Sequence, residues 1–198
     1  MRKVTLAITG ASGMPFATQL LQELLSNDCI VHLVVSAAGV LTFNQEMDFS
    51  LPSAPHKIHE VLTHELKLVN ADKLMVYGVK DWFAPIASGS SVDDVMIVCP
   101  CSMATLAKIA NGIGDDLICR AADVVLKERK NLIIVPRETP LSSIHLDNML
   151  KLSNIGVSVI PPVPAFYTKP QTIDDVVKFV VSRILDQAQI SNNLSKRW

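Results

Sequence analysis

Short apolar runs rich in β-branched residues alternate along the chain with longer stretches whose apolar residues recur at helical spacing. The runs predict strands at 4–9, 30–35, 74–76, 96–98, 132–135 and 158–160. The stretches between them predict helices at 16–25, 37–43, 103–110, 121–128, 143–154 and 173–190, with Thr172 as the N-cap of the last. Mixed polarity and two prolines leave 51–62 unassigned, whereas 81–91 and 161–170 are predicted loops.

Strands that alternate with helices are typical of βαβ units, which build a parallel sheet. The predicted strands are nearly continuous apolar runs, as expected of strands that are buried on both faces. The pattern therefore predicts an α/β fold of three layers, a Rossmann-like parallel sheet with helices on both faces. Because no internal repeat or linker interrupts it, residues 1–198 are predicted to form a single domain.

The composition is that of a folded protein, with 49% hydrophobic and 19% charged residues, and it excludes disorder. A formal net charge of -1 gives no reason to expect a nucleic-acid partner. No apolar run reaches the roughly 18 residues that span a bilayer, and the apolar stretch after Met1 is too short for a signal peptide. We therefore expect a cytoplasmic protein without a membrane partner.

The cysteines and histidines do not follow metal-binding patterns. Cys29, Cys99, Cys101 and Cys119 form no CxxC pair, and the five histidines are scattered without an HxxxH or HExxH spacing. The sequence thus predicts reduced thiols and no metal site.

Small and polar residues follow the predicted strands. The carboxyl ends of parallel strands meet at one edge of the sheet, which is where open α/β folds bind ligands. We therefore expect these residues to converge on a binding site. They are 9–13 after the first strand, Ser36 after the second, 99–105 after the fourth and 136–140 after the fifth.

The turn at 10–13 begins and ends with glycine. Glycines let the backbone approach a ligand closely, and the amides that start the next helix favour an anion. An ordinary strand-to-helix turn has the same composition. However, the dinucleotide order GxGxxG is absent, and Ser36 stands where an acidic residue would hold a ribose. These features argue against NAD and favour a mononucleotide with one phosphate, such as FMN.

Other polar residues at this edge allow a structural or a functional interpretation. Ser102 and Thr105 either cap the helix that follows or contact a ligand, and the two roles are compatible. Arg137 and Glu138 are harder to explain as surface residues, because they directly follow a buried strand at the expected ligand edge.

Four further residues are ambiguous alone. Arg120 and Lys127 lie seven residues apart, so they share one face of a predicted helix, which is usually a solvated surface. Tyr167 lies in a proline-rich loop and Arg183 on the last helix, where packing and surface exposure are the ordinary roles.

Five segments, taken together and in order, resemble those of the UbiX-type flavin prenyltransferases. They are GASG at 10–13, CPCS at 99–102, RAADVVLKER at 120–129, PRETP at 136–140 and PVPAFY at 162–167. The resemblance covers nearly the whole chain. It implies a flavodoxin-like fold, assembly of trimers into a homododecamer, and transfer of a dimethylallyl group from dimethylallyl monophosphate to reduced FMN, giving prenylated FMN.

The resemblance also implies site residues, some of them reaching across from a neighbouring subunit. FMN would be held by Gly10, Ala11, Ser12, Ser36, Ser102, Met103, Ala104, Thr105 and Arg137. The phosphate of dimethylallyl monophosphate would be held by Tyr167, Arg183, Lys127 and Arg137. The implied catalytic residues are Ser12, Lys127, Glu138, Glu46 and Arg120.

The expected chemistry breaks an allylic C–O bond without a metal, so cationic side chains must neutralise the departing phosphate. Glu138 is the expected base for the proton lost on ring closure, and Ser12 would position the flavin nitrogen that attacks first. The resemblance further implies that the product serves a UbiD-type decarboxylase, often in ubiquinone synthesis.

Two alternatives remain open. FMN-dependent cysteine decarboxylases share the expected fold, but they carry a histidine ahead of the strand that leads to the CPCS position, and 87–91 contains none. A non-catalytic FMN carrier is the other, although the basic cluster around Arg137 exceeds what the single phosphate of FMN requires.

Overall fold

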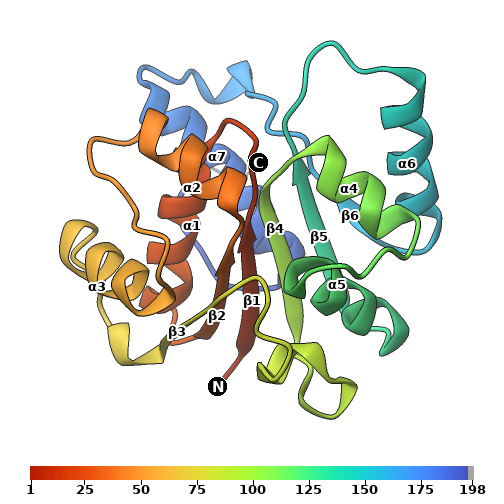
Figure 1. Ribbon diagram of the computed structural model, residues 1–198. Coiled ribbons are helices and arrows are strands. Elements are labelled where there is room, and N and C mark those ends of the chain that lie inside the picture. Colours follow the sequence, from red (N-terminus) through yellow and green to blue (C-terminus); the bar gives the residue numbers. More distant parts are fainter. Residues whose placement is uncertain (196–198) are drawn as a thin grey trace.

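The computed structural model describes residues 1–195, and its centre is a six-stranded parallel sheet (Figure 1). The sheet order is β3-β2-β1-β4-β5-β6, which is the doubly wound Rossmann arrangement. The predicted α/β class is therefore confirmed. The strands are β1 (Lys3–Ile8), β2 (Ile30–Val35), β3 (Leu74–Tyr77), β4 (Val95–Cys101), β5 (Asn131–Pro136) and β6 (Ser158–Val159).

Helices cover both faces of the sheet (Figure 1). Side chains of α1, α2, α3 and α7 join one hydrophobic core, and side chains of α4, α5 and α6 join a second core on the other face. The helices are α1 (Met14–Ser26), α2 (Ala37–Glu46), α3 (Pro55–Glu65), α4 (Met103–Ala110), α5 (Leu117–Lys127), α6 (Ser143–Asn154) and α7 (Ile173–Gln187).

The central strands contribute alternate residues to the two cores. In β1, Leu6 belongs to the first core and Ala7 to the second, and in β4 the same holds for Ile97 and Val98. Because side chains of a strand alternate between faces, a strand covered on both sides has no polar face. This is why the predicted strands read as continuous apolar runs.

Helix α3 begins within the segment 51–62 that the sequence left unassigned and continues to Glu65. Pro55 stands in its first turn, where the missing N–H would have no partner in any case. Ile58 and Leu62, four residues apart, are both buried in the first core. The packing of this apolar face against the first core thus stabilises a helix whose other positions are of mixed polarity.

Some predicted boundaries agree with the structure, and most of the others differ from it by one to three residues. Strand 30–35 and helices 103–110 and 143–154 match the structure. The predicted strand 96–98 continues through Pro100 to Cys101, and α5 starts four residues earlier than the predicted 121, at Leu117. The last helix ends at Gln187 rather than at 190. In the described part of the chain, no helix combines the length and apolarity needed to cross a membrane.

The predicted N-cap of α7 is present in the structure. Thr172 Oγ1 accepts from the Asp175 amide at 3.1 Å, and the Asp175 carboxylate accepts from the Thr172 amide at 2.9 Å. We expect Thr172→Ala to lower the free energy of unfolding by about 1 kcal/mol, measured by urea denaturation. Thr172→Ser keeps the hydroxyl and serves as the control; a loss of similar size in both variants would contradict the capping role.

Candidate functional site

Two turns meet where the strand order reverses, between β1 and β4. The chain leaves β1 for one face and β4 for the other, which opens a crevice at their carboxyl ends. Thr9 closes the base of this crevice: its buried hydroxyl donates to the Pro100 carbonyl at 2.9 Å and accepts from the Ser102 amide at 2.8 Å. These bonds fix the turn after β1 against the start of α4. We call this edge, with the residues that follow β1, β2, β4 and β5, the rim.

Gly10 brings the start of α2 to the first turn. A Cβ atom at Gly10 would lie 2.5 Å from the Cβ of Ala38, closer than any real contact. Gly13 adopts a φ of 127°, which side chains disfavour, as the chain turns into α1. Both glycines of the predicted turn are thus required by geometry.

The carboxylate of Glu46 occupies the amino end of α1. Its Oε2 accepts from the amides of Gly13 at 2.9 Å and Met14 at 2.8 Å. Burial alone would raise the pKa of Glu46. Hydrogen bonds from these amides and from the Ser12 side chain, with the nearby charge of Arg137, outweigh it and hold the pKa below its ordinary value. The anion expected at this helix end is therefore a side chain of the same protein, which places Glu46 beside Ser12 within one chain.

The starts of α2 and α4 offer other donors at the rim. Ser36 Oγ accepts from the Gly39 amide at 2.9 Å, and Ser102 Oγ accepts from the Thr105 amide at 3.3 Å. Both serines are thus N-caps, as the structural interpretation predicted for Ser102. The first amides of a helix lack intrahelical acceptors, so Ala37, Ala38, Met103 and Ala104 present N–H groups that suit phosphate or carbonyl oxygens.

Arg137 adds a positive charge to the same place. Its Nε donates to the Ser12 carbonyl at 3.3 Å, and its own amide donates to the Cys101 carbonyl at 3.3 Å. Glu138 is exposed, and its carboxylate accepts from the Thr139 amide at 3.1 Å. The rim therefore combines neutral caps, an arginine and two carboxylates.

The cations of α5 lie away from the rim of their own chain. Lys127 ends α5 and pairs with Glu128, beside Gly89 and just before β5 begins. Arg137 follows the other end of β5, and six strand residues span about 20 Å. Arg120, one turn into α5, donates to the Ala87 carbonyl at 3.1 Å and to Asp123 at 3.0 Å.

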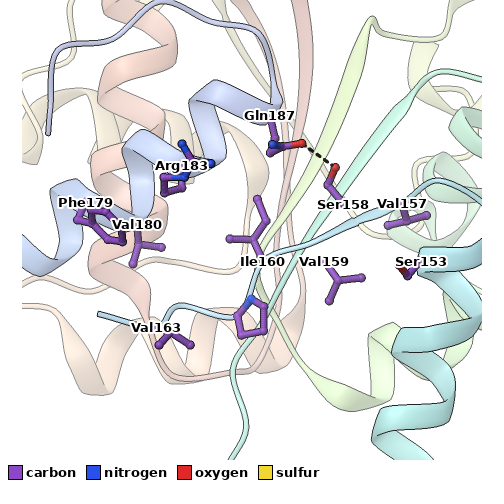
Figure 2. A pocket seen from close by; sticks show the side chains of 11 residues that line it. Ser153, Val157, Ser158, Val159, Ile160, Val163, Phe179, Val180, Arg183 and Gln187 are labelled. Atoms are coloured by element: carbon purple, nitrogen blue, oxygen red, sulfur yellow. Dashed lines mark hydrogen bonds between the residues drawn. The ribbon is translucent and has the colours of Figure 1, made fainter. Parts of the chain in front are cut away.

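Arg183 lines a separate groove of about 460 Å³ between α7, β6 and the segment that follows it (Figure 2). Figure 2 places Arg183 next to Val180 on α7, with Ile160 across the groove. Its Nη1 donates to Asp186 at 2.7 Å. Tyr167 packs edge-on against Phe179, which lines the same groove, with ring centroids 6.1 Å apart.

One chain therefore assembles part of the predicted site. At the rim lie Gly10, Ala11, Ser12, Ser36, Glu46, Ser102, Met103, Ala104, Thr105, Arg137 and Glu138, whereas Arg120, Lys127, Tyr167 and Arg183 lie elsewhere. The sequence placed Thr9 among the residues of this edge but did not predict that its hydroxyl joins the two turns. A hydroxyl that closes a buried apolar run was the available signal.

The cysteines are free and buried. Burial raises the pKa of Cys99 and Cys101 far above the ordinary thiol range. Among residues 1–195, Asp115, Asp116 and Cys119 are near enough to share an ion. However, Asp115 pairs with Lys108 at 2.8 Å, Asp116 accepts from the Cys119 amide at 2.8 Å, and burial raises the pKa of the Cys119 thiol to about 12.

Comparison with known proteins places this arrangement among flavoproteins. A family model described as Flavoprotein matches residues 1–185. A flavin prenyltransferase UbiX from Pseudomonas aeruginosa is 47% identical over 196 residues, which cover 99% of this chain and 93% of that protein.

Two solved structures share the fold and much of the sequence. One is described as AnUbiX (PadA1) in complex with FMN and dimethylallyl pyrophosphate, at 41% identity and a TM-score of 0.88, covering 100% of this chain and 97% of that one. The other is described as a dodecameric FMN-dependent UbiX-like decarboxylase from Escherichia coli O157:H7, at 43% identity and a TM-score of 0.87, covering 99% and 98%.

The Glu46 contacts predict how stability depends on pH. A carboxyl with a depressed pKa stabilises the folded state fully above its unfolded pKa, ordinarily 4.5, and this contribution disappears as the pH falls through the folded value. Because Glu46 is exposed, we expect its carboxylate to contribute only about 0.3–1 kcal/mol to the free energy of unfolding at pH 7. Urea denaturation of wild type and Glu46→Gln should differ at pH 7 and converge near pH 3. A constant difference across this range would contradict the assignment.

Proposed function

The chain belongs to the flavoprotein family and, within it, to the flavin prenyltransferases, and on this premise we propose that it transfers a dimethylallyl group from dimethylallyl monophosphate to reduced FMN. The observation that carries the proposal is the meeting of Ser12, Glu46 and Arg137 at the β1–β4 crevice. We treat residues 1–198 as one such domain.

The rim offers donors that suit FMN. The capped starts of α2 and α4 offer amides for phosphate and ring oxygens, and Arg137 adds a cation. Reduced FMN supplies the attacking nitrogen and the electron-rich ring. Ser12, hydrogen-bonded to Glu46, would hold that nitrogen in place, since Glu46 is itself fixed by two amides of α1.

The remaining task is to make phosphate leave. The allylic C–O bond breaks, phosphate departs with the bonding pair, and a C–N bond forms in its place. The proton released from the flavin nitrogen would pass to the departing phosphate. Lys127, Arg137, Arg183 and the Tyr167 hydroxyl would neutralise the departing dianion, with the arginines as bidentate donors. The second bond, a C–C bond, closes when a proton adds to the alkene of the transferred group and the ring carbon loses its own proton. Glu138, exposed next to Arg137, would accept that ring proton.

These cations cannot all reach one rim within a single chain. Lys127 precedes β5 and Arg137 follows it, and the strand between them spans about 20 Å. We therefore propose that neighbouring copies in a homododecamer supply Lys127 and Arg120, whereas Glu46 acts within its own chain. The dodecameric neighbour at 43% identity supports such an assembly.

The product would serve a UbiD-type decarboxylase. Prenylated FMN leaves this protein as a finished cofactor, so an acceptor enzyme must consume it. The four free, buried cysteines suit a reducing compartment, which supports the cytoplasm as the location.

The first test mixes the protein with reduced FMN and dimethylallyl monophosphate and weighs the flavin. We expect a gain of one dimethylallyl unit for wild type and unchanged FMN for Lys127→Ala, because the first bond then cannot break. Glu138→Gln should give the added mass without the absorbance spectrum of the ring-closed product. Unchanged FMN with the wild-type protein would contradict prenyl transfer and favour a non-catalytic FMN carrier. Decarboxylation of a cysteinyl peptide would instead favour an FMN-dependent cysteine decarboxylase.

Mixed oligomers test the role of neighbouring copies. Lys127→Ala and Arg137→Ala should each be inactive as pure proteins. If Lys127 reaches the rim of another chain, random one-to-one assembly leaves both residues intact at about a quarter of the sites. We expect activity to return to about that fraction after co-expression with two different tags. Absence of any recovery in verified mixed oligomers would show that both residues act within one chain.

A further inference from the structure

A buried polar cluster joins β1, β2 and the segment that leads into β4. The carboxylate of Asp93 accepts from Thr5 Oγ1 at 2.6 Å and lies 2.7 Å and 3.0 Å from His32 Nδ1 through its two oxygens. Thr5 and Asp93 are 1% exposed and His32 is 5% exposed. None of the three belongs to the rim.

Such a cluster is costly to bury. A carboxylate removed from water must find hydrogen-bond partners, and apolar residues of similar size would pack here with less desolvation. Its neighbours on the same strands, Ala7 and Val34, are apolar and fully buried in the second core. Packing between strands therefore does not explain the three polar residues.

The segment anchored by Asp93 supports two of the proposed catalytic cations. It runs from Pro85 to Val92, between β3 and β4. The Ala87 carbonyl accepts from Arg120 Nε at 3.1 Å. Two residues later, a Cβ atom at Gly89 would lie 2.6 Å from Lys127 Nζ, so the ammonium occupies the space that a side chain would take there.

We propose that Asp93, with Thr5 and His32, is a positioning residue for Arg120 and Lys127. The buried carboxylate fixes the end of the 85–92 segment to two strands of the sheet. The segment in turn holds the side chains of Arg120 and Lys127 in place on α5. The inference rests on the proposed function, because it assigns the anchor a role in that reaction. A displacement of about 1 Å at a reacting group is enough to lose orders of magnitude in rate.

The test is Asp93→Asn, which keeps the shape and removes the charge. We expect kcat for prenyl transfer to fall at least about tenfold, while the Kd for FMN changes less than about twofold, because FMN binds at the rim. Amide hydrogen exchange in 85–92 should accelerate. Thr5→Val should also lower kcat, because it removes the hydroxyl that donates to Asp93. Thr5→Ser keeps the hydroxyl and should have a kcat close to that of the wild type.

Leu25→Ala is the control for a general loss of stability. Leu25 is fully buried in the first core, whereas Ile86 of the 85–92 segment belongs to the second core, on the other face of the sheet. The Leu25→Ala variant should unfold at a lower temperature without a change in kcat of the folded protein. The inference is overturned if Asp93→Asn keeps kcat within about twofold of an active wild type, or loses kcat and FMN affinity together. A wild type that transfers no prenyl group would instead overturn the proposed function itself.

Discussion

The hydroxyl of Thr9 joins the two halves of the sheet at the point on which the site depends. It donates to the carbonyl of Pro100 and accepts from the amide of Ser102, so the turn after β1 and the start of α4 hold a fixed separation. Two charged rim residues bond to the first of these turns, Arg137 to the Ser12 carbonyl and Glu46 to the Gly13 amide. A buried hydroxyl with both bonds made is rigid, because no water competes for its partners.

Glu46 neutralises the amino end of α1 from within the same chain. The amino end of α1 is the most obvious anion site in the sequence, yet a carboxylate from α2 fills it. The same carboxylate accepts a hydrogen bond from the Ser12 side chain and is stabilised by the charge of Arg137. Glu46 therefore links two residues to which the proposed function gives a role. In the proposed function, the ligand phosphate is therefore assigned to the starts of α2 and α4, whose caps are neutral.

The length of a strand sets the second constraint. Residues at the two ends of β5 are separated by the sheet itself, and no side chain spans that distance. A reaction that needs Lys127 beside Arg137 must therefore use two copies of the chain. The buried cluster around Asp93 acts at the same distant end, where it holds the backbone that α5 contacts.

The sequence by itself determined the α/β class, most element positions and the composition of the rim. It could do so because buried strands, helix caps and strand-end turns are local features: Thr172, Ser102 and Gly13 act within a few residues of themselves. Family resemblance supplied the reaction.

Only the tertiary structure decided what depends on distant contacts. Helix α3 forms because Ile58 and Leu62 find a core, the α1 anion comes from a residue 33 positions beyond Gly13, and Asp93 meets Thr5 across 88 positions. Periodicity carries no information about such partners, because their distance in space is set by the order of strands in the sheet.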